Sequence, residues 1–173
     1  ESLATLLEGD FVPKSLLPAY ESVARDLLKR VDDVFARTEF QPIRLHGDCH
    51  PGNILARDDA FHLVDLDDCR MGPSVQDIWM MLAGERHERL GQLSELVDGY
   101  SEFHDFAPRE LPLIEALRAL RLMHYSAWLA RRWDDPAFPM SFPWFGTERY
   151  WGDQVLILRE QMSALQEEPL KLF

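Results

Sequence analysis

Several residue patterns that mark whole classes of protein are absent from this sequence. Only two cysteines occur, Cys49 and Cys69, which cannot form a framework of disulfides, so we expect a reducing, cytoplasmic location. No run of about eighteen apolar residues is present, and no basic segment followed by an apolar one opens the chain, so neither a membrane span nor a signal peptide is predicted. The formal net charge is -12 and basic residues form no block, which disfavours nucleic acid as a partner.

Lysine is scarce in this sequence, and a glycine-rich phosphate-binding loop is absent. The chain has three lysines and no G-x-G-x-x-G segment. Gly47 and Gly52 have the spacing of the two glycines in a P-loop, but Asn53 and Ile54 follow where that loop requires Lys and then Ser or Thr. A P-loop nucleotide site is therefore excluded.

The remaining sequence indicates a folded unit of mixed secondary structure. The 173 residues are 46% apolar and 11% aromatic, enough for a substantial core. Short apolar segments predict strands at residues 43–45, 54–56 and 61–66, the last two joined by a turn at 57–60 into a hairpin. Helical spacing predicts helices at residues 15–35, 75–83 (capped by Ser74), 90–103, 109–133 and 148–167, with a proline-broken loop at 134–146. The expected fold class is α+β, mainly helical with a small β-hairpin.

The segment from His46 to Asn53 carries the strongest functional signal. It reads His-Gly-Asp-Cys-His-Pro-Gly-Asn and places Asp48 five residues before Asn53, which is the spacing of the kinase catalytic loop. Gly47 stands where that loop has arginine. Asp65 ends an apolar strand, where such sites place another magnesium ligand, and the hairpin should bring Asn53 and Asp65 to one rim. Taken alone, Asp48 could simply be a turn residue that bonds backbone N–H groups. The prediction of phosphoryl transfer therefore depends on His46, Asp48, Asn53 and Asp65 together.

These motifs resemble the aminoglycoside phosphotransferase and choline kinase group of protein-kinase-like enzymes, whose loop reads H-G-D-x-H-x-x-N. Residues 44–55, 64–73, 75–82 and 131–139 together resemble the bacterial stress response kinase A family. The resemblance extends over essentially the whole chain. It implies a protein-kinase-like fold and an ATP- and Mg²⁺-dependent serine/threonine protein kinase, with ATP and a protein substrate as partners.

The resemblance also implies roles for individual residues. Asp48 would accept the proton of the substrate hydroxyl, and Asn53 and Asp65 would bind Mg²⁺. Asp67 is a further metal candidate, because alternation along a strand points it to the same side as Asp65. Supporting roles in the catalytic loop are implied for His46, His50 and Asp77.

The supporting residues are expected to act on the backbone of the loop. His46 would be buried within it, His50 would brace it through hydrogen bonds, and Asp77 would fix it by accepting hydrogen bonds from backbone N–H groups. Leu55 and Val64 would form the floor of the adenine pocket, with ordinary hairpin core as the alternative.

A complete kinase also needs an N-terminal lobe with a Gly-rich loop and a strand lysine paired to a helix glutamate. None of Lys14, Lys29 and Lys171 lies in a suitable strand. We therefore expect a C-terminal lobe with its N-lobe absent, comprising an inter-lobe segment at residues 1–14, the catalytic loop and metal-binding hairpin at 43–73, and a helical subdomain at 74–173. By itself this fragment is expected to be inactive and to self-associate.

Other interpretations remain open at this point. The phosphate acceptor could be a small molecule, such as an aminoglycoside or a choline-like alcohol, or the fragment could be a non-catalytic interaction module. A metal hydrolase is a further alternative, because His46, Asp48 and His50 alternate like zinc ligands. The aromatic residues between Trp133 and Trp151 are expected to pack the proline-broken loop onto its own helices, with a docking surface as the alternative.

Overall fold

The computed structural model describes residues 1–58 and 60–172, so Phe173, the last residue of the predicted helical subdomain, lies outside the described residues. The chain divides into two compact units. Unit 1 comprises Glu1–Phe35 and Glu115–Glu167, and unit 2 comprises Ala36–Ile114 and Glu168–Phe173. The described secondary structure is mainly helical with two two-stranded antiparallel sheets, which confirms the predicted α+β class.

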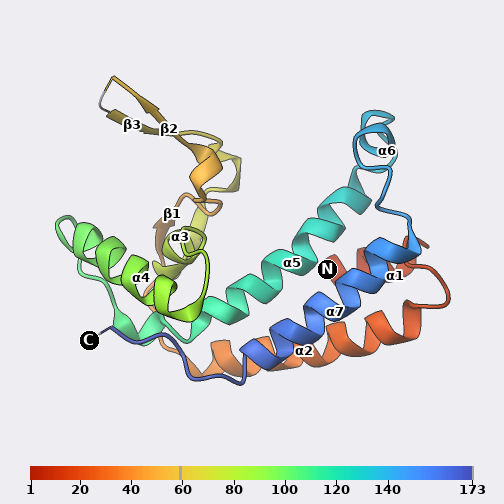
Figure 1. Ribbon diagram of the computed structural model, residues 1–173, viewed down its shortest axis with the longest axis horizontal. Helices are drawn as coiled ribbons and strands as arrows, with labels where there is room; N and C mark the ends of the chain where they lie inside the picture. Colours follow the sequence, from red (N-terminus) through yellow and green to blue (C-terminus); the bar gives the residue numbers. More distant parts are fainter. Residues whose placement is uncertain (59, 173) are drawn as a thin grey trace. The chain divides into compact units, whose positions relative to one another are not determined.

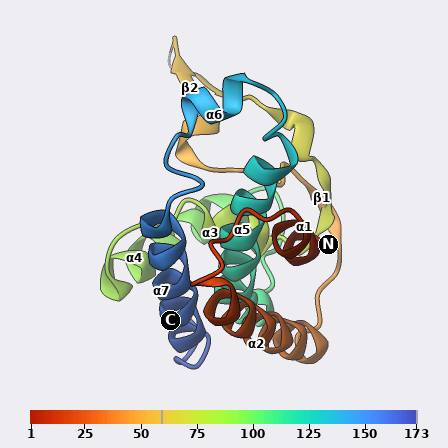
Figure 2. The same ribbon diagram turned by 90° about the vertical axis from the view of Figure 1, so that its right-hand side faces the viewer.

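Unit 1 is built from helices. Its elements are α1 (Ser2–Glu8), most of α2 (Leu17–Arg37), α5 (Leu113–Arg131) from Glu115 onward, α6 (Ala137–Ser141) and α7 (Glu148–Ala164). The views in Figures 1 and 2 both show α2 and α7 side by side. Helix α2 begins two residues later than predicted, because the N–H groups of Leu16 and Leu17 both bond to the carbonyl of Pro13 in a preceding turn.

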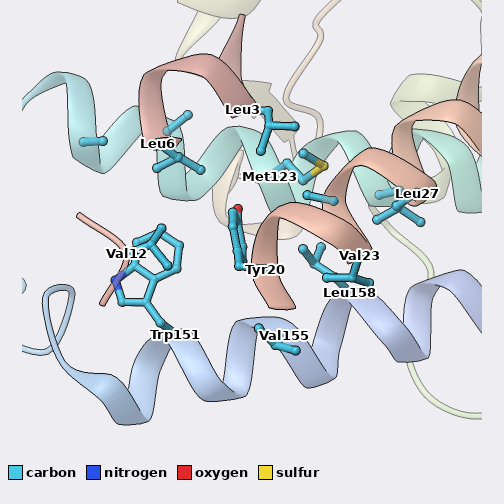
Figure 3. Packing of buried hydrophobic residues seen from close by; sticks show 14 of the residues in the cluster. Leu3, Leu6, Val12, Tyr20, Val23, Leu27, Met123, Trp151, Val155 and Leu158 are labelled. Atoms are coloured by element: carbon cyan, nitrogen blue, oxygen red, sulfur yellow. The ribbon is translucent and has the colours of Figure 1, made fainter. Parts of the chain in front are cut away.

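The core of unit 1 lies between α1, α2, α5 and α7 (Figure 3). Tyr20, Val23 and Leu27 occupy one face of α2, as the helical spacing predicts. The rings of Tyr20 and Trp151 meet edge to face with centroids 5.1 Å apart. Burial of an apolar side chain such as Val23 or Leu27 contributes about 1.5–3 kcal/mol, so this face of α2 stabilises unit 1.

The proline-broken segment contains one element that the sequence analysis did not predict. Helix α6 spans Ala137–Ser141 and includes Pro139 in its first turn, where the missing N–H would have no intrahelical acceptor. The rings around it pack closely, with Phe145 lying 4.9 Å from Trp133 and 5.4 Å from Trp151 between centroids. The expectation that the aromatic residues pack this segment onto its own helices is confirmed.

Unit 2 contains both sheets. Strand β2 (Ile54–Arg57) pairs with β3 (Ala60–Leu63) as the predicted hairpin, with Ile54 opposite Leu63. Strand β1 (Ile43–Leu45) pairs with β4 (Arg70–Gly72), with Ile43 opposite Gly72. Strand β4 was not predicted because it has three residues and no alternation. Within unit 2 the β2–β3 hairpin extends away from β1 (Figure 1).

The helices of unit 2 correct several predicted boundaries. Helix α3 is short (Val75–Trp79), whereas α4 (Arg86–Ser101) begins earlier than predicted because Glu85 and Glu88 form a reciprocal capping box. A 3₁₀ turn (η3, Pro108–Glu110) replaces the predicted start of α5. In α7 the predicted end at 167 is three residues too late.

Ser74 does not cap α3 with its own side chain, contrary to the prediction. Its hydroxyl instead donates a 2.7 Å hydrogen bond to Oε2 of Glu110, and the same oxygen accepts a 3.1 Å bond from the N–H of Val75. Glu110 is only 2% exposed. The buried side chain of Glu110 in η3 thus accepts the hydrogen bond of a backbone N–H group at the start of α3.

Across residues 1–58 and 60–172, no helix has the length and apolar character required to span a bilayer.

Candidate active site

The candidate site is built on the loop between β1 and β2 in unit 2. His46 follows β1 directly and is 8% exposed. Its Nε2 lies 2.9 Å from the carbonyl of Val64, and its Nδ1 lies 3.4 Å from the backbone nitrogen of Asp48. A neutral imidazole protonated on Nε2 satisfies both contacts. His46 therefore ties the loop to the residue that precedes Asp65.

Asp77 on α3 holds the start of the same loop. Its Oδ2 accepts a 2.7 Å hydrogen bond from the N–H of His46, and its Oδ1 accepts a 2.9 Å bond from the N–H of Gly47. Gly47 has a φ of 87°, and a Cβ at this position would lie 2.1 Å from the carbonyl oxygen of Asp68. This crowding explains why the loop carries glycine where the kinase loop has arginine.

Asp48 and His50 lie next to each other at the tip of the loop. Nδ1 of His50 accepts a 3.0 Å hydrogen bond from the N–H of Gly52, which caps the 3₁₀ turn η1 (Pro51–Asn53). Nε2 of His50 faces the carboxylate of Asp48 and lies 3.7 Å from its Oδ2. The Asp48 side chain is 13% exposed. His50 is thus in contact with both the loop backbone and the predicted base.

Asn53 joins the loop to the hairpin. Its Nδ2 donates a 3.0 Å hydrogen bond to the carbonyl of Asp48, which leaves the amide oxygen as the end that could bind a metal. Its backbone carbonyl accepts a 3.0 Å hydrogen bond from the N–H of Val64, the residue before Asp65. The structure therefore brings Asn53 and Asp65 to adjacent ends of β2 and β3, as the hairpin predicted.

The conformation around Asp65 differs from the prediction. Strand β3 ends at Leu63, Asp65 adopts a left-handed conformation with φ 61° and ψ 66°, and Leu66–Asp68 forms a 3₁₀ turn (η2). Aspartate tolerates this conformation better than most residues, which is why the strand can stop here. The strand alternation that placed Asp67 beside Asp65 is therefore wrong, and Asp67 lies exposed in the turn.

The two predicted adenine-pocket residues differ in exposure. Leu55 is 52% exposed, whereas Val64 is half-buried. Leu55 is thus not ordinary hairpin core, which was the alternative interpretation. Leu63 and Phe61 on β3 are also exposed, at 54% and 80%. The hairpin presents apolar side chains that the described residues of unit 2 leave largely exposed.

Comparison with known proteins identifies the family. The sequence model of the phosphotransferase enzyme family matches residues 6–120. The chain belongs to the phosphotransferase enzyme family. It is 47% identical over 165 residues to "Stress response kinase A" of Escherichia coli strain K12 and to "Serine/threonine protein kinase RdoA" of Salmonella typhimurium strain LT2. Each alignment covers 95% of this chain and 50% of the relative, so the chain spans about half the length of these relatives.

A solved structure confirms the fold of this phosphotransferase family member. The crystal structure of a spectinomycin phosphotransferase in complex with ADP and spectinomycin matches with a TM-score of 0.55 and 16% sequence identity. The match covers 90% of this chain and 49% of that chain. The predicted resemblance to stress response kinase A and the predicted phosphotransferase fold are both confirmed.

The loop between β1 and β2 does not have the geometry of a zinc site. Both ring nitrogens of His46 are engaged by backbone groups, so neither can bind a metal in this conformation. Within residues 1–58 and 60–172, no group of three or more His, Cys, Asp or Glu side chains could hold a metal ion. The predicted alternative of a metal hydrolase with His46, Asp48 and His50 as ligands is therefore wrong.

Acidic side chains lie close to Cys49 in the loop between β1 and β2. Burial raises the pKa of the Cys49 thiol above its usual value, and the nearby carboxylates of Asp77 and Asp48 raise it further. Cys49 therefore stays protonated at neutral pH. The negative charge of these carboxylates attracts divalent cations and basic groups to the region of Asp48.

Two residues that contact the loop or its supporting helix were not found by sequence reasoning. Gln76 donates a 3.0 Å hydrogen bond to the carbonyl of Gly47, and Glu110 caps α3, which carries Gln76 and Asp77. Glutamine in a helix gives no distinctive pattern. The only available signal was that Gln76 directly precedes Asp77.

Proposed function

We propose that this chain supplies the catalytic base and the metal ligands of an ATP- and Mg²⁺-dependent kinase that phosphorylates a hydroxyl group of a protein. One observation carries the proposal: Asn53 is bonded through its side chain to the carbonyl of Asp48 and through its backbone to Val64, beside Asp65. The proposed base and both proposed metal ligands thus belong to one hydrogen-bonded frame. Membership of the phosphotransferase enzyme family supports the same reaction class.

In this proposal Asp48 accepts the proton of the attacking hydroxyl. The backbone before it is held by Asp77 at two N–H groups and by His46 at a third, so the carboxylate needs little rearrangement when the substrate binds. His50, 3.7 Å from Oδ2 of Asp48, limits the rotation of that carboxylate. Proton acceptance by a positioned base contributes about 10²- to 10⁴-fold to a rate.

The chemistry of the proposed metal ligands fits magnesium. Mg²⁺ prefers oxygen ligands and uses one or two protein side chains together with phosphate oxygens, so a cage of three carboxylates is not required. The amide oxygen of Asn53 and the carboxylate of Asp65 would hold it, with Asp67 as a weaker candidate. When bound, the ion would neutralise charge on the phosphates that are transferred and released.

ATP is proposed as the phosphate donor, with Leu55 and Val64 beside the adenine. The half-exposed side chain of Leu55 and the hydrogen bond from the N–H of Val64 to Asn53 put apolar surface directly next to the proposed metal ligands. The spectinomycin phosphotransferase with the same fold was crystallised with ADP, which supports a nucleotide partner.

For the acceptor we propose a serine or threonine hydroxyl of a protein. The support is the printed name of the Salmonella relative, a serine/threonine protein kinase, at 47% identity. A small-molecule alcohol is the second candidate, because the structural neighbour has spectinomycin bound. The two candidates use the same base and metal ligands, so an acceptor panel separates them.

We further propose that this chain has little activity without the other half that its relatives contain. Four exposed apolar side chains lie on the hairpin or just after it, and we propose that another copy of the chain covers them when that other half is absent; they are Leu55, Phe61, Leu63 and Leu66. A cytoplasmic location is proposed because both cysteines are unpaired.

The decisive test is a chimera in which this chain replaces the aligned half of E. coli stress response kinase A. Transfer from radiolabelled ATP would be measured to casein, to myelin basic protein and to spectinomycin. We expect transfer to the proteins, and a fall in kcat of about 10²- to 10⁴-fold in the Asp48→Asn chimera. Asp58→Asn, at the far end of the hairpin, is the matched control and should keep full activity. Equal activity of the Asp48→Asn and Asp58→Asn chimeras would refute the proposed base.

A further inference from the structure

Helix α3 contacts the loop through two neighbouring side chains. Asp77 accepts a 2.9 Å hydrogen bond from the N–H of Gly47. Gln76 donates a 3.0 Å hydrogen bond from Nε2 to the carbonyl of the same glycine. Consecutive residues of one helix therefore hold the two polar backbone groups of Gly47.

The orientation of the Gln76 amide follows from its other contacts. Nε1 of Trp79, a buried residue, lies 3.3 Å from Oε1 of Gln76. An indole N–H can only donate, so the atom that faces it must be the amide oxygen, and the atom that faces Gly47 must be the NH₂ group. Sδ of Met80, a weak acceptor, lies 3.5 Å from the same Nε2. The amide is thus fixed as a donor toward the loop.

Gly47 is the point of the loop that needs such support. Glycine populates positive and negative φ with similar ease, so the peptide between Gly47 and Asp48 can rotate at little steric cost. The carbonyl of this peptide is bound by Gln76, and its N–H, which belongs to Asp48, faces Nδ1 of His46 at 3.4 Å. Because 3.4 Å is long for a hydrogen bond, the shorter bond from Gln76 supplies most of the restraint.

We infer that Gln76 is a positioning residue, which fixes the Gly47–Asp48 peptide and thereby the direction of the Asp48 carboxylate. This inference rests on the proposed function of Asp48 as the base. A change in ψ of Gly47 that φ of Asp48 does not compensate moves the Cα of Asp48, and a displacement of about 1 Å can lower a rate by about 100-fold. Asp77 cannot replace Gln76, because a carboxylate accepts hydrogen bonds from N–H groups and cannot donate one to a carbonyl.

The first test uses this chain alone and does not depend on catalysis. Hydrogen exchange of the Asp48 amide would be measured by NMR in the wild type, in Gln76→Met and in Gln92→Met. Gln92 is the matched control, because its Oε1 accepts a 2.8 Å bond from the N–H of Ala83, away from the loop. Loss of one hydrogen bond predicts exchange about two- to tenfold faster at Asp48 in Gln76→Met, and no change in Gln92→Met. Equal exchange in all three proteins overturns the inference.

The second test measures kinetics in the chimera with E. coli stress response kinase A. Gln76→Met should lower kcat by about 10- to 100-fold while the KM for ATP and the melting temperature match those of Gln92→Met. A kcat equal to that of the control overturns the inference. If the wild-type chimera transfers no phosphate, the proposed function fails, and the exchange of the Asp48 amide alone decides whether Gln76 positions the loop.

Discussion

Asp77 and Gly47 are linked by a 2.9 Å hydrogen bond from the glycine N–H to Oδ1, in a position where glycine has a φ of 87°. The bond joins α3 to a loop residue at which a Cβ would clash with the backbone. A Cβ on Gly47 would lie 2.1 Å from the carbonyl oxygen of Asp68 and 3.0 Å from Nε of Arg70. The arrangement of the loop therefore depends on the absence of a single methyl group.

Gly47→Ala is expected to destabilise the chain strongly. The positive φ costs about 1–2 kcal/mol for a residue with a Cβ, and the clash with the Asp68 backbone adds to it. Urea unfolding followed by circular dichroism would measure the loss. The matched control is Gly91→Ala in α4, where a Cβ meets no atom within 4 Å and helix propensity predicts a gain of about 0.5–1 kcal/mol. Equal stabilities of the two variants would contradict the geometry of the loop.

The proposed metal ligands predict a ranking of nucleotide affinities. In the chimera, Asp65→Ala and Asn53→Ala should each weaken MgATP binding by at least about tenfold, because each removes an oxygen ligand of the ion. Asp67→Ala should have a smaller effect, because the η2 turn removes the strand alternation that would point Asp67 to the side of Asp65. Titration calorimetry with and without Mg²⁺ measures this, with Asp58→Ala as the control. A loss at Asp67 as large as that at Asp65 would assign the metal to the other carboxylate.

The two cysteines should differ in reactivity. The raised pKa of Cys49 lowers the fraction of thiolate at any pH below that pKa, and Cys49 is partly buried, whereas Cys69 is exposed. At neutral pH, iodoacetamide should therefore alkylate Cys49→Ser, which retains Cys69, faster than Cys69→Ser, which retains Cys49. The alkylation rate of Cys49 should rise at higher pH in the folded chain than in urea. Identical pH profiles in both conditions would show that the fold does not perturb this thiol.

The chain by itself should show no measurable phosphate transfer and should self-associate as its concentration rises. Its relatives are about twice as long, and the hairpin exposes Phe61 at 80%. Light scattering should detect less association in Phe61→Glu than in the wild type. Phe103→Glu is the control, because Phe103 is 91% exposed outside the hairpin. If both variants associate like the wild type, the hairpin is not the contact surface.

The parts of the fold that local sequence determines were predicted well. Strand β1 and the hairpin follow from short apolar segments separated by turn residues, and the spacing of Asp48, Asn53 and Asp65 follows from one motif. The closeness of Asn53 to Asp65 could be predicted because a hairpin brings its two ends together. No distant contact was needed for these features.

Features that depend on distant partners were missed. Glu110 caps α3 from 35 residues downstream of Val75, and Gln76 reaches Gly47 across 29 residues. Strand β4 forms only because β1 is available to pair with it. The left-handed turn at Asp65 is local, but apolar residues before it, Phe61, Leu63 and Val64, gave no sign that the strand would stop. The periodicity of apolar residues in the sequence indicates which face of a helix or strand is buried. It carries no information about hydrogen bonds between distant residues.

The cap that Glu110 provides for α3 predicts how a mutation at this buried residue would behave in a genetic screen. Glu110 is 2% exposed and bonds to Ser74 and Val75, which directly precede Gln76 and Asp77, the two residues that contact the loop. Replacing Glu110 with leucine would leave buried donors without an acceptor and loosen the helix that carries Gln76 and Asp77. In a screen for inactive mutants of the full-length protein, such an allele would be recovered together with changes at the proposed base, Asp48. The abundance of the protein in the cell would then distinguish loss of the α3 cap from loss of the proposed base.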